Sequence, residues 1–188
     1  MMRILAIDPG NVQSAFVAFD AEHGDVTSAG IQENRLLLEQ IRIASSDRLA
    51  IEFVACYGMS VGRTVFDTCC WIGRFIEAFD GPYNKVMRKS RWGPGPEQYG
   101  SEGIYEGECM HLCKINRAKD TNIRQALIDR FGPGKEAAVG VKAKKGPLYG
   151  FRKDMWAALS VAVTFADQYE ALRKDNNLQA GDIGRGAI

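Results

Sequence analysis

The 188-residue sequence has no apolar run long enough to cross a membrane as a helix. It also has no signal-peptide pattern, because Arg3 and a strand-like segment follow the first methionines at once. The five cysteines are an odd number and match no secreted disulfide framework. These absences exclude membrane-spanning and disulfide-rich secreted classes, and we expect a cytoplasmic protein with free thiols.

Excess charge of either sign is also lacking, since the formal net charge is +1. A global electrostatic attraction to nucleic acid is therefore excluded, and any such attraction has to come from local basic patches. Internal repeats are absent. The length suits one domain with a sizeable core.

The segment from Ile4 to Gly10 reads Ile-Leu-Ala-Ile-Asp-Pro-Gly. Its apolar run predicts a buried strand, and the following run from Gln13 to Phe19 predicts a hairpin partner. Asp8 is the single acid at the end of that strand, where a charge is costly without a cationic partner. It is either a catalytic carboxylate or the first residue of an Asp-Pro-Gly turn.

A second acid lies inside an apolar run, because residues 49–55 read Leu-Ala-Ile-Glu-Phe-Val-Ala. Acids within core-type strands are rare, so Glu52 and Asp8 together indicate a shared cation. The alternative is an edge strand with Glu52 facing water.

Periodicity and turn signals predict the remaining elements. We expect one domain over residues 1–175, an inserted Gly/Pro/Glu-rich loop at 93–107, a basic loop at 134–153 and a flexible tail at 176–188. The expected strands are 25–32, 85–88 and 108–115, and the expected helices are 34–46, 60–79, 120–131 and 154–174. The helix at 60–79 is apolar on more than one side, which favours burial against a second subunit.

Three strands followed by alternating helices and strands are the element order of the ribonuclease-H-like fold. We therefore predict an α/β protein with a mixed five-stranded sheet and helices on both faces. Three segments resemble RuvC-type Holliday junction resolvases: Ile4 to Gly10, Leu49 to Glu52, and Asp154-Met-Trp-Ala-Ala-Leu-Ser-Val-Ala. Residues 117–133 and 146–150 resemble the phage-encoded branch of that family.

The resemblance implies a site of two Mg²⁺ ions, for which Mn²⁺ substitutes, and no small-molecule cofactor. Asp8 would bridge both ions, Glu52 would hold one and Asp154 the other. Asp154 alone would be interpreted as a helix cap. The family carries another acid one turn later, where this chain has Ala157; Asp120 and Asp67 are possible substitutes.

Basic residues beside the acid-bearing segments are the candidate DNA contacts, since phosphates are bound by Lys and Arg. They fall into three segments, each of which could instead be a solvated surface: Arg88 and Lys89; Arg117, Lys119 and Arg124; Lys142, Lys144 and Lys145. Family analogy makes Lys119 the best single contact.

The implied activity is a crossover junction endodeoxyribonuclease of DNA recombination and repair, cutting by paired symmetric nicks as a homodimer on four-way junctions. It would work in the host cytoplasm if phage-encoded. A nuclease for flaps or forks and a catalytically impaired junction-binding protein remain alternatives. A sugar-kinase-type phosphotransferase is disfavoured because it needs a second domain. Cys109, His111 and Cys113 alternate on the predicted strand, and with Cys69 or Cys70 they could hold zinc. Their spacing, however, is not that of a zinc knuckle or ribbon.

Overall fold

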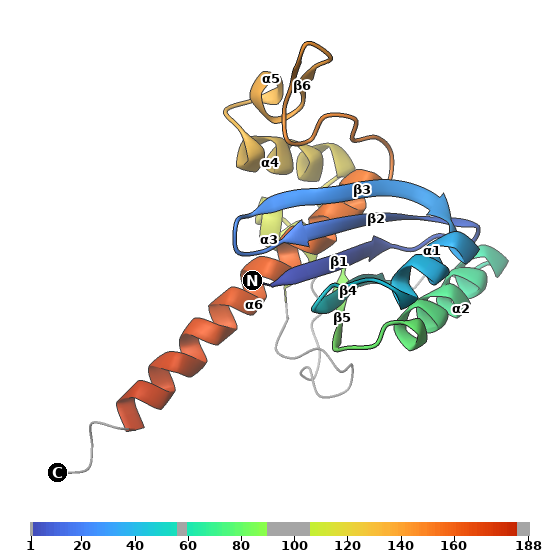
Figure 1. Cartoon of the computed structure of the whole chain (residues 1–188), viewed down its shortest axis with the longest axis horizontal. Helices are drawn as coiled ribbons and strands as arrows, with labels where there is room; N and C mark the ends of the chain where they lie inside the picture. Colours follow the sequence, from blue (N-terminus) through green and yellow to red (C-terminus); the bar gives the residue numbers. More distant parts are fainter. Residues whose placement is uncertain (1, 56–59, 90–105, 184–188) are drawn as a thin grey trace.

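The fold is built on a mixed five-stranded sheet (Figure 1). The computed structural model describes residues 2–55, 60–89 and 106–183, with 175–183 as helix backbone alone. The strand order is β3-β2-β1-β4-β5. The first three strands pair antiparallel, and β4 and β5 continue the sheet in parallel. The strands are β1 (Arg3–Asp8), β2 (Gln13–Asp20), β3 (Asp25–Glu33), β4 (Arg48–Phe53) and β5 (Tyr83–Met87).

Strand β1 is central, and both of its faces are buried. Ile4 and Ala6 contribute to one apolar cluster, while Leu5 and Ile7 contribute to another on the opposite face. Successive strand side chains point to opposite faces, so a continuous apolar run is what a doubly covered strand requires. The predicted mixed sheet with helices on both faces is confirmed.

One face is covered by the last helix, α6 (Met155–Ile183). Its residues from Met155 to Ala166 are almost all buried, which matches a helix that is apolar nearly all round. The helix α4 (Asp120–Phe131) adds Ile123, Leu127 and Ile128 to the same cluster. The opposite face is covered by α1 (Asn34–Arg42) and α2 (Arg63–Ala78).

The predicted basic loop at 134–153 contains ordered structure. A short helix, α5 (Lys135–Ala138), precedes a small hairpin of β6 (Gly140–Val141) and β7 (Lys144–Lys145). The hairpin lies so close to α5 that only glycine fits at position 146, because a Cβ there would come within 2.3 Å of the Ala137 carbonyl oxygen. The basic side chains of this segment therefore stand on a defined scaffold.

The strand predicted over residues 108–115 is wrong. The chain forms a helix there, α3 (Glu108–Cys113), which packs against α4 and α6. The alternation of Cys109, His111 and Cys113 resembled a strand pattern, but Cys109 and Cys113 are also four residues apart and share a helix face. Since the segment is six residues long, the two periods were hard to separate.

The end of the chain also differs from the expectation. Helix α6 continues to Ile183, past the expected end near Lys174, and extends beyond the sheet (Figure 1). Propagating an established helix is far easier than starting one, so the polar residues after Asp175 continue it.

Of the predicted inserted loop, residues 93–105 lie outside the described residues. No helix in the described part of the chain is long and apolar enough to cross a membrane.

Candidate active site

Asp8 ends β1, and a buried polar network fixes the turn that follows it. The Ser14 hydroxyl accepts a hydrogen bond from the Gly10 amide at 3.1 Å and donates to Asn34 Oδ1 at 2.7 Å. The Asn34 amide group donates back to the Gly10 carbonyl at 2.9 Å. A Cβ on Gly10 would lie 2.3 Å from the Gln13 carbonyl oxygen, so only glycine fits this turn. The position of Asp8 is therefore set by buried, paired groups.

Glu52 lies on β4, beside Asp8. Ile7 of β1 is in register with Ile51 of β4, so the two acids follow at the same edge of neighbouring parallel strands. The Asp8 carboxyl donates a hydrogen bond to the Glu52 carboxylate. Glu52 is half-buried, and β5 pairs with its outer side, which excludes the edge-strand alternative.

Asp154 directly precedes α6 and faces the same region. Its carbonyl oxygen accepts the first helical hydrogen bond from the Ala158 amide at 3.0 Å. Lys153 before it has a φ of 46°, the left-handed conformation that non-glycine residues adopt rarely and often near functional sites. The Asp154 carboxylate is close enough to Asp8 to raise its pKa. The three acids predicted from the sequence thus come together.

Burial and mutual repulsion change how these acids titrate. The pKa of Asp8 is raised to about 8, first because the group is buried and then because Glu52 and Asp154 lie nearby. Burial also raises the pKa of Glu52, while the Arg88 guanidinium acts in the opposite direction. Without a bound cation, the pair shares a proton near neutral pH.

Glu108 is a further acid of the site, and the sequence analysis did not predict it. It is the first residue of α3 and is fully buried (0% exposed). Its Oε2 accepts from Arg88 Nη1 at 3.3 Å and from the Ser160 hydroxyl of α6. Its Oε1 is buried, and within the described part of the chain it has no hydrogen-bond partner. The sequence does contain a sign of this acid, because Glu108 adjoins a mainly apolar segment, Cys-Met-His-Leu-Cys, as Asp8 and Glu52 adjoin theirs.

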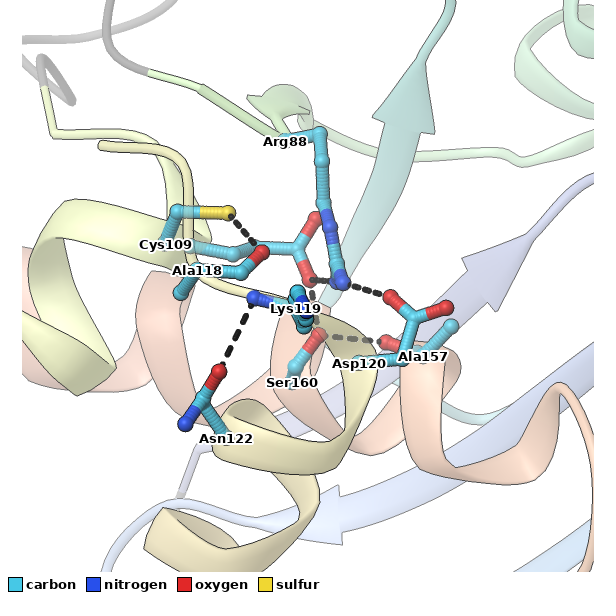
Figure 2. Close-up of polar contacts among 9 residues, drawn as sticks. Arg88, Cys109, Ala118, Lys119, Asp120, Asn122, Ala157 and Ser160 are labelled. Atoms are coloured by element: carbon cyan, nitrogen blue, oxygen red, sulfur yellow. Dashed lines mark hydrogen bonds and ion pairs between the residues drawn. The ribbon is translucent and has the colours of Figure 1, made fainter. Parts of the chain in front are cut away.

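Arg88 follows β5, and Figure 2 shows its guanidinium beside the Asp120 carboxylate. Besides Glu108, it contacts the Asp120 carboxylate at the start of α4, and its side chain is 20% exposed. The neighbouring Lys89 is half-buried. Arg88 and Lys89 were predicted as DNA contacts; Arg88 sits inside the acidic site instead of on an open basic surface.

The two acids considered as substitutes for the one missing at Ala157 lie in different places. Asp120 pairs with Arg88, and its charge contributes to the raised pKa of Glu52. Asp67 lies on α2 and forms an ion pair with Arg63 at 3.7 Å. Asp120 therefore borders the site, whereas Asp67 belongs to the helix on the opposite face of the sheet.

The remaining predicted basic residues lie around α4 and on the hairpin. Lys119 and Arg117 are exposed beside the start of α4. The Arg124 guanidinium lies over the ring of Trp156, 4.6 Å from its centroid. Lys142 and Lys144 are exposed, and the Lys145 ammonium lies 5.2 Å from the centre of the Tyr149 ring.

An ion-pair cluster ties the three helices on this side together. Asp167 of α6 accepts two hydrogen bonds from Arg130 of α4, at 2.7 and 2.8 Å. Its Oδ2 also pairs with His111 Nε2 of α3 at 2.9 Å. The three helices are thus cross-linked through one carboxylate.

The donor set suits a hard divalent cation. Carboxylate oxygens are the ligands of Mg²⁺ and Mn²⁺, and no described residue forms a hydrogen bond with the buried Oε1 of Glu108. Within the described residues, no group of three or more His, Cys, Asp or Glu side chains is already arranged to hold a metal ion. The site is therefore a set of adjacent acids that would close around an ion, and the suggested Cys/His zinc group is not formed.

Fold and site together define a class: a ribonuclease-H-like α/β domain with acids gathered at the end of its central strand. The structure is similar to that of Thermus thermophilus RuvC, with a TM-score of 0.54 at 12% identity, covering 87% of this chain and 92% of that one. It is also similar to T. thermophilus RuvC in complex with Holliday junction substrate, with a TM-score of 0.55 at 14% identity, covering 92% and 96%. At such identities the likeness establishes the fold. No family model and no curated protein matches the sequence.

The raised pKa of Asp8 predicts a pH-dependent stability in metal-free buffer. Between its ordinary value of 3.8 and about 8, the folded chain holds a proton that the unfolded chain has released, so stability falls as pH rises through this range. Asp8→Asn removes this dependence. Its Tm should exceed the wild-type Tm at pH 8.5 by at least about 2–4 °C, equivalent to about 1 kcal/mol for a chain of this size.

At pH 3, below both values, position 8 is neutral in the folded and unfolded states of both proteins, and the Tm difference should nearly vanish. Thermal unfolding with EDTA at both pH values measures it. Asp25→Asn, which removes an exposed carboxylate at the start of β3, should keep the wild-type profile. Equal Tm differences for Asp8→Asn at both pH values would contradict the assigned cause.

Proposed function

We propose that this protein is a metal-dependent, structure-specific endodeoxyribonuclease that resolves Holliday junctions. The observation that carries the proposal is the convergence of Asp8, Glu52 and Asp154 from β1, β4 and the start of α6 in a ribonuclease-H-like fold. The similarity to RuvC bound to a Holliday junction substrate supports the choice of substrate.

The chain's own groups would hold two Mg²⁺ ions, with Mn²⁺ as a substitute. Asp8 would be shared between them, Glu52 would hold one and Asp154 the other. Two such ions supply phosphodiester hydrolysis with an activated water and a stabilised leaving oxygen. The buried Ser14–Asn34 network fixes the Asp8 turn, so the carboxylate is preorganised rather than ordered at each turnover.

DNA would approach over α4 and the β6–β7 hairpin. Exposed Lys119, Arg117, Lys142 and Lys144 would provide the phosphate contacts. Tyr149 is 40% exposed beside Lys145, where an aromatic ring is able to stack on a base opened at a branch point.

Two other activities use the same site. A nuclease for flaps or forks needs the same acids and basic surface. Ala157 favours a junction-binding protein with impaired catalysis, because the first turn of α6 then brings no second acid to the site beside Asp154. A panel of labelled four-way, flap and fork substrates with Mg²⁺ or Mn²⁺ separates these activities from one another.

Paired symmetric cuts require two active sites, so we propose a two-fold homodimer. Helix α2 is the candidate interface, because Phe66 is 59% exposed there although Phe75 is buried in the core. Trp71 and Arg74 line a groove of about 630 Å³ between α1 and α2. The groove carries charges of both signs, which an isologous, self-complementary contact can pair: Arg35, Arg42, Arg74, Glu39 and Glu77.

Removing the acids should separate cleavage from binding. Asp8→Asn, Glu52→Gln and Asp154→Asn should each lower the rate of junction cleavage by at least about 100-fold, since metal-site groups contribute this much or more. Junction affinity, measured by gel shift with Ca²⁺ in place of Mg²⁺, should stay within about threefold of wild type. Asp25→Asn is the exposed control, and wild-type cleavage by Asp8→Asn would disprove the site.

The lysines of the hairpin should contribute sequence-independent affinity. Changing Lys142, Lys144 and Lys145 together to Gln should weaken binding to all junction sequences alike. The slope of log K against log[salt] should become shallower by up to about 0.9 for each phosphate that a lysine no longer neutralises. Lys174→Gln, on α6 and paired with Glu170, is the control. An unchanged salt slope would mean that the hairpin does not contact DNA.

The homodimer should depend on the exposed face of α2. Light scattering at micromolar concentration should give twice the mass of the 20.8 kDa chain. Phe66→Asp should give monomers with weak junction resolution, because an unpaired charge in an apolar contact is costly. Phe66→Leu should remain dimeric. A wild-type monomer that still makes paired symmetric cuts would rule out the dimer.

A further inference from the structure

After Asp154, the last helix contributes no further acid to the site. Ala157, one turn after Asp154, carries no polar side chain, and Ser160 follows on the same face. The Ser160 hydroxyl donates to the Ala157 carbonyl at 2.9 Å and also contacts the Glu108 carboxylate (Figure 2). The side chain of Glu108 therefore reaches, from another helix, the face of α6 on which an acid at position 157 would stand.

Backbone contacts direct Glu108 to this place. The Cys109 amide donates to the Arg88 carbonyl at 3.1 Å, which joins the start of α3 to the end of β5. Arg88 Nη1 and Ser160 hold one carboxylate oxygen, Oε2. The side chain is thus fixed by three separate elements, α3, the end of β5 and α6.

The other oxygen, Oε1, is buried and has no hydrogen-bond partner among the residues that the structure describes. An unpaired buried carboxylate oxygen is expensive, and such a group calls for an explanation. Glu52 and Asp8 are near enough to raise the pKa of Glu108. A cation bound among these acids would satisfy Oε1 and relieve the repulsion.

We propose that Glu108 is a ligand of the divalent-metal site, with Oε1 as the binding atom, and that it replaces the carboxylate that α6 lacks at Ala157. This inference rests on the proposed function, because it takes the metal site of that proposal as given. It names a ligand on α3 in place of one on α6.

The charges of the site agree with this role. The acids at or bordering it are Asp8, Glu52, Asp154, Glu108 and Asp120, and Arg88 is the guanidinium between the last two. Five carboxylates and one guanidinium leave four negative charges, which is the charge of two divalent cations. Arg88 therefore neutralises one negative charge beside Glu108 and Asp120, and the metal ions would neutralise the remaining four.

Direct titration with Mn²⁺ tests the role without relying on cleavage. Calorimetry or Mn²⁺ electron paramagnetic resonance on the full chain gives the affinity. Glu108→Gln should lower it by at least about 10-fold. Glu106→Gln is the matched control, since Glu106 lies two residues earlier and pairs with His111 at 3.4 Å, and it should bind Mn²⁺ as the wild type does.

A relocated acid distinguishes a ligand from a structural partner of Arg88. Ala157→Asp in the Glu108→Gln background should restore Mn²⁺ affinity to within about threefold of wild type, because the acid returns to the site from α6. If Ala157→Asp does not restore affinity, Glu108 acts through Arg88 and the proposal is overturned. Wild-type affinity in Glu108→Gln overturns it directly.

Two measurements keep these outcomes separable. If Glu108→Gln does not fold, as its thermal unfolding curve would show, Glu108→Asp is titrated instead; its shorter reach should lower the Mn²⁺ affinity, and unchanged affinity overturns the proposal. Wild-type protein and Asp8→Asn are titrated in parallel. Loss of Mn²⁺ binding in Asp8→Asn with full binding in Glu108→Gln would leave the proposed function standing and reject Glu108 alone.

Discussion

Burial of acidic side chains against one another is the constraint on which this structure depends. Glu108 is fully buried, and Asp8 and Glu52 are partly buried beside it. Glu52 raises the pKa of both other acids, and Asp8 raises the pKa of Glu108. Arg88 opposes that repulsion for Glu52 and Glu108. Such an arrangement is unfavourable for folding unless the surrounding structure is strong enough to impose it.

The rest of the fold supplies that strength. Strand β1 is held by β2 and β4 and is covered on both faces, so Asp8 cannot move outward without disturbing two apolar clusters. The turn after it is fastened by Ser14 and Asn34, both nearly inaccessible to solvent. The stability of the cores is thus used to keep an electrostatically strained site in place, as active sites commonly require.

Much of this could be predicted from the sequence, and the limits have physical causes. Asp8 and Glu52 stand out because a charge inside an apolar run is visible locally, and the sheet confirms their adjacency. Asp154 needed the family resemblance, since a helix cap gives the same local signal. Glu108 directly precedes an apolar segment, but that six-residue segment is too short to show whether it is a strand or a helix. The place of Arg88 among the acids depends on partners 20 and 32 residues away, which no local pattern reports.

The carboxylate of Asp167, which joins His111 of α3 and Arg130 of α4 to α6, has a consequence for the site. Glu108 is the first residue of α3 and Asp120 is the first residue of α4, so both acids belong to helices that are bound to the same carboxylate of α6. Asp8 and Glu52 belong to the sheet instead. The site is therefore assembled from two layers, the sheet and the helices on one of its faces. Arg88, which follows β5 and pairs with both Glu108 and Asp120, is the side chain that joins the layers at the site.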